Sequence, residues 1–438
     1  MSQETMIRDL IERMDSVRSD YQDKDRYYRG EQSTAYLSKK DRQMIDDRLQ
    51  QLVINYPRLV VESYVERLRL LGFTVDGDRD EIVAEAWLRN RMGDKSAQAH
   101  TDALIYGQGY VSVWNGPLGP RVAVENPLNV AVIRDPADGR VLYGAKTWID
   151  RDKQHRLVTY TPEVITKYTN TVRATVGAPP PPNGWTVADG GTIPNPTGLV
   201  PLVPIVNRGR ISEVDGVSEM SDILPLADAL NKLTQDSIVT SETYARPRRW
   251  VTGLAVQFDD DDNPVDPFSS DLEMYQGEDE GIKFGQFDPA DMAGYTAMAA
   301  LITQQIGAVS GLPPHYLGLN GDQPPSADSI RSAVASLVAR ALGMQRSFGQ
   351  AWADVGELIH AVRGEQGVKP APVWASAETR TPAQDSDAVT KLHAAGIIDR
   401  TAALEQLGWN PDKIKEIEDR FAQSGKPGQT EDDGTAVA

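Results

Sequence analysis

The 438-residue sequence contains no cysteine and only five histidines. Without cysteine there can be no disulfide framework, no thiolate catalysis and no cysteine-ligated zinc, which suits a reducing compartment. No histidine lies in an HExxH motif or beside a GxSxG nucleophile turn. We therefore predict no catalytic residue and no enzyme. The five histidines are His100, His155, His315, His360 and His393.

Recognisable sites for nucleotides and metal ions are also missing. The sequence has no GxxxxGKS/T phosphate loop, and Gly107 and Gly109 precede a strand-like run, whereas a dinucleotide loop opens a helix. The acidic run 259–262 would need a glycine at the place of Pro264 to form a calcium loop. We interpret this run as a solvated hairpin tip, and we predict no cofactor and no metal site.

Basic residues are outnumbered, with 45 Lys and Arg against 63 Asp and Glu, a net charge of −18. Nonspecific DNA binding relies on Lys and Arg to displace counterions, so this charge disfavours a free-standing DNA-binding protein. The acidic excess is concentrated in residues 253–291, which hold twelve acidic residues and one basic residue. No signal-peptide-like start and no run of about 18 apolar residues occurs, so we predict no membrane contact.

The first half of the chain alternates helix-like and strand-like patterns, which is typical of an α+β body. A second helix is expected to open at Pro57 and to close at Gly72, with Leu68 and Leu71 facing inward. The Gly- and Pro-rich stretch 179–204 is predicted to be a loop. The other expected helices cover 1–29, 80–91 and 95–106, and the expected strands cover 109–115, 120–124, 129–134, 140–149 and 155–161.

The second half contains two long helical seams with apolar steps of three and four, over residues 223–244 and 292–309. Ordinary amphipathic core helices would show the same pattern. A Pro- and Gly-rich loop, 311–325, precedes a helix of roughly 37 residues that ends near Arg363. Gly343, Gly349 and Gly356 mark possible bends in that helix.

This order of parts resembles the portal protein of tailed bacteriophages, in particular the portals of siphophages that infect actinobacteria. Each motif is weak alone, but four occur in the right order, and the resemblance extends over nearly the whole chain. The motifs are PLADALNK at 225–232, ARPRRWVTG at 245–253, SGLPPHYLG at 310–318 and PSADSIR at 325–331.

The resemblance implies a portal fold with an α/β wing, an antiparallel helical stem, a small β-containing clip, a long wing helix and a helical crown. The parts would be the N-terminal helix 1–29, the wing 30–215 and 327–380, the stem helices 216–245 and 290–310, the clip 246–289, the tunnel loop 311–326, the crown 381–421 and a disordered tail 422–438.

The resemblance also implies a role for three groups of residues. The tunnel loop would project towards DNA, although its leucines would alternatively only pin the loop to its own subunit. The acidic clip would dock partner proteins, and the stem–clip arginines would bind either phosphate or a neighbouring clip. These residues are Pro313, Pro314, His315, Tyr316, Asn320, Gly321 and Asp322 in the loop; Asp259, Asp260, Asp261, Asp262, Glu278, Asp279 and Glu280 in the clip; and Arg246, Arg248 and Arg249 at the junction.

Portal proteins form a ring, typically of twelve subunits, at one capsid vertex. Double-stranded DNA is packaged through the ring by the terminase motor, retained there and later ejected. The implied partners are further copies of the chain, DNA, the terminase large subunit, the head–tail adaptor, and the major capsid and scaffold proteins. The implied location is the virion, after assembly in the cytoplasm of the bacterial host.

Two other classes of protein compete with this reading. A head–tail adaptor ring without motor docking would also be structural, but adaptors are usually far shorter and lack paired stem helices. A metal-dependent hydrolase would place carboxylates on strand ends in a pocket, whereas here they crowd a predicted hairpin tip.

Overall fold

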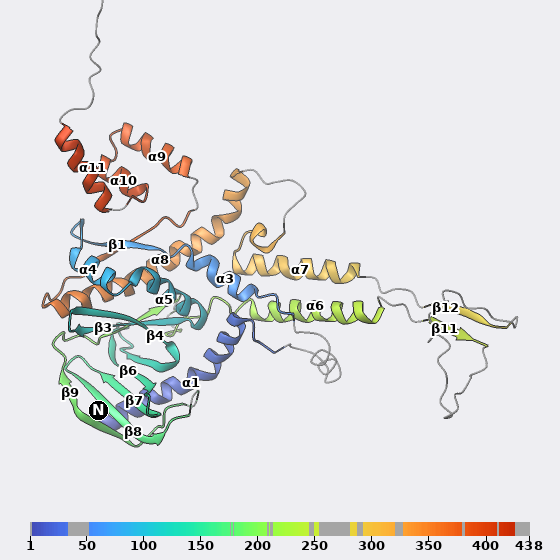
Figure 1. Cartoon of the computed structure of the whole chain (residues 1–438), viewed down its shortest axis with the longest axis horizontal. Helices are drawn as coiled ribbons and strands as arrows, with labels where there is room; N and C mark the ends of the chain where they lie inside the picture. The colour runs from blue at the N-terminus through green and yellow to red at the C-terminus, as the bar shows by residue number, and fades with distance from the viewer. Residues whose placement is uncertain are drawn as a thin grey trace, which may run out of the picture. The chain divides into compact units, whose positions relative to one another are not determined.

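The computed structural model describes residues 2–33, 52–175, 177, 179–207, 210, 213–244, 249–253, 281–286, 292–319, 327–378, 382–409 and 411–424. The chain divides into two compact units, Met1–Ala375 and Ser376–Ala438. Helices and antiparallel strands both contribute to the first unit, which confirms the predicted α+β class (Figure 1).

The N-terminal helix α1 (Gln3–Arg29) lies across a five-stranded antiparallel sheet (Figure 1). It begins where the Ser2 side chain accepts a hydrogen bond from the Thr5 amide, and it ends at Gly30, whose φ of 74° suits glycine. The apolar side of α1, including Leu10 and Met14, packs on the sheet to form one core. The strands, in their spatial order, are β5 (Val130–Arg134), β6 (Val141–Ile149), β7 (Gln154–Tyr160), β8 (Val164–Arg173) and β9 (Trp185–Pro194).

The long helix α8 (Ala327–Arg363) supports two further three-stranded sheets. It buries Met344, Phe348 and Trp352 completely. The Trp352 indole donates a 2.8 Å hydrogen bond to Nε2 of His100, and burial lowers the pKa of His100 to about 3, so the imidazole is a neutral acceptor. The sheets are β10 (Leu202–Val206), β3 (Gln108–Gly116) and β4 (Gly119–Glu125), and β13 (Ala371–Trp374), β1 (Leu70–Val75) and β2 (Asp78–Arg79).

Helices and short turns connect these sheets. Helix α5 packs against β3 and β4, and α4 packs against α8. The predicted helices over 80–91 and 95–106 are confirmed as α4 and α5. The connecting elements are α3 (Tyr56–Val65), α4 (Glu81–Arg89), α5 (Met92–Tyr106) and the short 3-10 helix η1 (Pro127–Asn129).

Two of the sequence predictions for this unit are wrong. Helix α3 ends at Val65 instead of Gly72, and Leu71 lies in β1 with 56 % of its surface exposed instead of facing inward. The predicted loop 179–204 contains the whole of β9 and the start of β10. The two adjacent glycines of β9 lie where its register with β8 shifts: Gly190 has a φ of 61°, and a Cβ on Gly191 would come within 2.5 Å of the Ala188 carbonyl.

The remaining elements of the first unit follow β10 in the chain. The strands β11 and β12 pair antiparallel, with Arg249 opposite Gln286 and Thr252 opposite Lys283. The elements are α6 (Leu224–Tyr244), β11 (Arg249–Thr252), β12 (Lys283–Gln286), α7 (Ala293–Ser310) and the 3-10 turn η2 (Pro314–Leu317).

The second unit is helical where the structure describes it. Its buried side chains include Val389, Ala403 and Ile414, one from each helix. The Arg400 guanidinium lies 3.8 Å from the centre of the Phe421 ring, which fixes α10 beside α11. The helices are α9 (Pro382–Ala394), α10 (Arg400–Gln406) and α11 (Pro411–Ser424). In the described part of either unit, no helix combines the length and the apolar character that a membrane span requires.

Candidate functional site

Helices α6 and α7 lie side by side and run antiparallel (Figure 1). The Thr240 hydroxyl, late in α6, is 3.2 Å from the Tyr295 hydroxyl, early in α7. Leu230 of α6 and Ile306 of α7 are buried, as the seams predict, but Val309 is 37 % exposed. The two helices therefore form a hairpin whose open end leads towards β11 and β12 in the chain.

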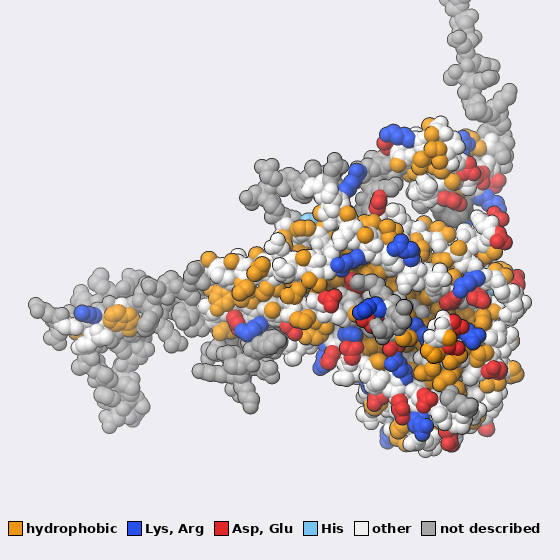
Figure 2. All heavy atoms as spheres, turned by 180° about the vertical axis from the view of Figure 1, so that it is seen from behind, with side chains coloured by type: hydrophobic (Ala, Val, Ile, Leu, Met, Phe, Trp, Pro, Cys, Tyr) orange, Lys and Arg blue, Asp and Glu red, His pale blue; other side chains and the backbone are white. Residues whose placement is uncertain are grey.

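Helix α7 carries no charged residue along its 18 positions. Met298 and Leu301 are 50 % and 51 % exposed. At 100° per residue, these two side chains share one stripe with Val309, while Ile302 and Ile306 lie on the packed side. On the face of the molecule that Figure 2 shows, apolar side chains cover most of the α6–α7 pair. An uncharged helix with an exposed apolar stripe is unusual on a soluble monomer and indicates an interaction surface.

A compact turn follows α7. Gly311 ends the helix with a φ of 74°, and Gly318 ends η2 with a φ of 71°. Leu312 and Leu317 are buried at 4 % and 6 % exposure, so these two leucines pin the turn to its own subunit. Gly307 makes room for this packing, because a Cβ there would come within 2.6 Å of Leu317.

Helix α3 and the residues after it hold this turn with three hydrogen bonds. The Tyr64 hydroxyl, which is buried, donates to the Ser310 carbonyl at 2.6 Å. The Arg67 guanidinium donates to the Tyr316 hydroxyl at 3.0 Å. The Tyr56 hydroxyl donates to the carbonyl of Leu317 at 3.4 Å. A cluster of long-range bonds thus anchors residues 310–317, which we call the turn root.

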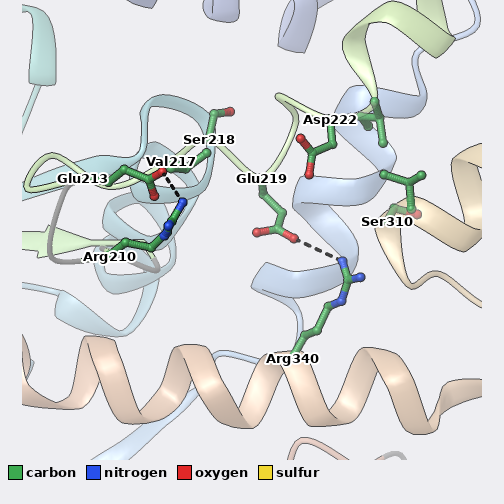
Figure 3. A pocket seen from close by; sticks show the side chains of 10 residues that line it. Arg210, Glu213, Val217, Ser218, Glu219, Asp222, Ser310 and Arg340 are labelled. Carbon is green, nitrogen blue, oxygen red and sulfur yellow. Dashed lines mark hydrogen bonds and ion pairs between the residues drawn. The ribbon is translucent and has the colours of Figure 1, made fainter.

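Beside the turn root lies a polar pocket of about 300 Å³ (Figure 3). Nη1 of Arg340, from α8, is 3.8 Å from Oε1 of Glu219, whose side chain is 2 % exposed. The other carboxylate oxygen of Glu219 accepts from Nδ2 of Asn207 at 3.3 Å. Arg210 and Glu213 form an ion pair on the opposite side of the pocket (Figure 3). These contacts join α8 to the segment that enters α6.

The start of α6 is held separately. The Tyr27 hydroxyl of α1 donates to Oδ2 of Asp228 at 2.8 Å, and the Ile54 amide donates to Oδ1 of Asn231 at 2.8 Å. Burial raises the pKa of Asp228, and the hydrogen bond from Tyr27 opposes that rise. The base of the helix hairpin is therefore fixed to the body of the first unit.

The structure describes four of the seven residues predicted for the tunnel loop. Pro313 is buried, Pro314 is exposed, and His315 and Tyr316 are partly exposed. The ring centres of His315 and Tyr316 are 5.0 Å apart. Asn320, Gly321 and Asp322 lie outside the described residues. The predicted contact of this loop with DNA stays a prediction.

The other predicted site residues are largely outside the described part of the chain. Arg249 begins β11, and only its backbone is described. Within the described residues, no group of three or more His, Asp or Glu side chains could hold a metal ion. The residues outside the description are Asp259, Asp260, Asp261, Asp262, Glu278, Asp279, Glu280, Arg246 and Arg248.

Sequence reasoning missed the residues that hold the turn root. Neither Tyr64 nor Arg67 belongs to a motif that the sequence analysis identifies. The bond between Arg67 and Tyr316 joins residues 249 positions apart. No local pattern encodes such a contact, so only the three-dimensional structure reveals it.

The α+β body, the antiparallel helix pair, the Pro- and Gly-rich turn and the 37-residue helix define the architecture of a phage portal subunit. The family model for phage portal proteins of the SPP1 Gp6-like type matches residues 7–426, so the chain belongs to this family. It is therefore a structural protein of the phage particle.

Two similar proteins are portal proteins of mycobacteriophages. The chain is 29 % identical to that of Mycobacterium phage D29 over 82 % of its own length and 76 % of the relative's. It is 28 % identical to the portal protein of Mycobacterium phage L5, over 85 % of its own length and 79 % of the relative's. A solved structure titled the neck of the empty GTA particle, computed with C6 symmetry, shares the fold at a TM-score of 0.50 and 16 % identity, covering 81 % of this chain and 89 % of that one.

Proposed function

We propose that copies of this chain form a ring at one capsid vertex, through which double-stranded DNA is packaged, retained and ejected. Family membership supports this function. The observation on this chain that best supports ring formation is the outward side of α7. It carries no charged residue, although 25 % of the residues of the protein are charged. The resemblance implies twelve copies.

The apolar stripe of α7, made of Met298, Leu301 and Val309, is the surface that we assign to a neighbouring copy. In a closed ring each copy presents two different surfaces to its neighbours, so the stripe of one copy meets another surface of the next. Burial of apolar area stabilises such a contact by roughly 25 cal/mol per Å². An uncharged stripe also avoids burying an unpaired charge.

The turn root and the loop after it are the part that we assign to DNA. Exposed Pro314 and partly exposed His315 support contact with the duplex. We assign the same contact to residues 320–322 from the family resemblance alone. Pro313 and Tyr316 would hold the turn in place, since one is buried and the other accepts a bond from Arg67. Such contacts would be steric and directed at the DNA backbone, without reading of bases.

We assign the docking of partner proteins to the acidic residues 259–262 and 278–280. Terminase large subunit would dock there during packaging and the head–tail adaptor afterwards, because an acidic surface attracts a basic partner. Arg246, Arg248 and Arg249 would pair with a neighbouring acidic segment. Capsid and scaffold proteins would surround the ring, which would assemble in the host cytoplasm.

Native mass spectrometry tests the ring with the variant Leu301→Asp. A carboxylate in the stripe would be buried without a partner, so we expect the concentration needed for assembly to rise roughly tenfold or more. The wild-type particle should have a mass near twelve times 48.0 kDa. If the chain alone stays monomeric, the same comparison is made with capsid and scaffold proteins present.

The matched control is Leu88→Asp, because Leu88 of α4 is 75 % exposed and lies outside the stripe. Rings that form equally well from both variants would show that the α7 stripe is not an interface. Loss of assembly in both variants would point to nonspecific damage and would also remove the support for this surface.

A further inference from the structure

The four residues between α3 and β1, 66–69, bind two segments that are far apart in the chain. On one side, the guanidinium of Arg67 donates to the Tyr316 hydroxyl of the turn root at 3.0 Å. On the other side, the carbonyl of Arg69 accepts from the amide of Ala375 at 2.8 Å. Ala375 is the last residue of the first unit, directly before the second unit begins at Ser376.

Gln345, in the middle of α8, connects these two sides. Its Nε2 donates to the carbonyl of Arg67 at 2.9 Å and to the carbonyl of Ala375 at 3.1 Å. A glutamine amide has two N–H donors, and here each is used by a different segment. Gln345 is 7 % exposed and Arg67 is 8 % exposed, so water competes little for these bonds.

A continuous series of polar contacts therefore runs from Ala375 through Gln345 and Arg67 to Tyr316. Every step is a hydrogen bond between groups on different elements, and Arg67 uses its backbone for one partner and its side chain for the other. Arg67 thus links the segment at Ala375 to the segment at Tyr316, although each segment also has hydrogen bonds of its own. A shift of α8 or β13 that moves the Arg67 backbone would also move the group that holds Tyr316.

We propose that Arg67 and Gln345 are positioning residues that couple the chain end of β13, at Ala375, to the turn root. The coupling is a property of the subunit, while its use in sensing or gripping DNA rests on the proposed portal function. A displacement of β13 or of α8 would reach the turn root through these two side chains. Helix α3 adds the second fixed point, because Tyr64 holds Ser310 directly.

Amide hydrogen exchange on the full-length chain tests the coupling. The reporters at the turn root are the amides of Tyr316, Gly318 and Leu319, which bond to the Pro313 and Pro314 carbonyls. The reporter at β13 is the Ala375 amide, and strands β6 and β7 report on the rest of the fold. Arg67→Met should speed exchange at the turn root roughly tenfold and leave β6 and β7 unchanged.

Gln345→Met carries the decisive result, because Gln345 donates only to Arg67 and Ala375 in the described contacts and not to the turn root. We expect faster exchange at Ala375 and also, about threefold or more, at the turn root. In the double variant, Gln345→Met should add nothing at the turn root once the Arg67 side chain is gone. Arg67→Lys should restore part of the protection.

The matched control is Ser347→Ala, which removes a 3.1 Å hydrogen bond from the same helix to the Val206 carbonyl. It should leave the turn root unchanged. If Arg67→Met fails to fold, Tyr316→Phe removes the same bond from a partly exposed side chain. Normal turn-root exchange in Gln345→Met, or faster exchange spread evenly over β6 and β7, would overturn the coupling. Neither result would bear on ring formation, which the particle mass measures.

Discussion

At the scale of single residues, His360 binds two carboxylates at once. Its Nε2 is 2.8 Å from Oδ2 of Asp80, and its Nδ1 is 2.7 Å from Oε2 of Glu365. Asp80 also caps α4 by accepting the Val83 amide at 3.0 Å. Burial lowers the pKa of His360, but the bonds to the two carboxylates outweigh it and raise the pKa above 6.5. The imidazolium thus ties α8 to the start of α4.

This arrangement makes stability depend on pH. Because the pKa of His360 is higher in the folded chain than in the unfolded chain, its stabilisation is complete below about pH 6.5 and is lost as the pH rises through the folded value. Thermal unfolding should show that His360→Gln is destabilised by about 1–2 kcal/mol at pH 5.5 and by less at pH 8.5. His393→Gln, at an exposed position, should show no such trend. An equal loss of stability at every pH would contradict a charged His360 between the two carboxylates.

The residues of the turn root show how far sequence reasoning reaches at this scale. The prolines and glycines after Ser310 end a helix by local sterics, so the turn could be predicted. The bond between Tyr316 and Arg67 could not be predicted, since Arg67 comes from the chain after α3. Contacts across 249 residues leave no periodic trace in the sequence.

At the scale of elements, long helices could be predicted and short strands only in part. The steps of three and four in the apolar pattern identify α6, α7 and α8, because a buried helix face needs that spacing. The edge strand β9 has both adjacent glycines and a 50 % exposed valine, Val187, so it lacks the alternation of a half-buried strand. Its partner β8 provides the pairing that its own sequence does not indicate.

Two of the glycines in α8, which the sequence suggested as bends, are explained instead by close packing against the segment that contains β13. A Cβ on Gly356 would come within 2.3 Å of Pro370 Cγ, and one on Gly349 within 3.4 Å of the Trp374 indole nitrogen. Both glycines therefore let the segment containing β13 approach the helix closely. A Cβ on Gly343 would meet only the end of the Arg346 side chain, at 4.0 Å.

Two alanine variants on this one helix should have opposite effects. Gly343→Ala should raise the free energy of unfolding by about 0.5–1 kcal/mol, because alanine favours the helix and nothing obstructs it. Gly356→Ala should lower it by roughly 1–3 kcal/mol, because the overlap with Pro370 exceeds that gain. Urea denaturation measures both. A stabilising Gly356→Ala would mean that Pro370 moves freely away from α8.

At the scale of the whole molecule, the order of the parts identified the family before any geometry was known. Four short motifs in the right order were enough: three lie at junctions between elements, and the fourth lies in the first turns of α6. Sequence could not give the contacts that link those parts. Glu219 with Arg340 joins the entry of α6 to α8, and Gln345 joins α8 to both Arg67 and Ala375.

The largest charge asymmetry of the molecule gives the last prediction. Neutralising Asp260, Asp261 and Asp262 to asparagine should weaken binding of purified terminase large subunit roughly tenfold at low salt, because the acidic segment attracts a basic partner. The difference from wild type should shrink as salt rises, since screening removes the same attraction. Fluorescence titration at two salt concentrations measures both effects, and the particle mass should not change.

The control for that variant removes three acidic charges elsewhere, with Asp76→Asn, Asp78→Asn and Glu81→Gln, all at exposed positions around β2. A general loss of negative charge would weaken both variants alike, because long-range attraction depends on net charge. If the acidic segment is the docking surface, terminase binding is weakened only in the first variant. Equal affinity of the first variant and the wild type at both salt concentrations would exclude this segment as the terminase contact, and would leave the ring itself untouched.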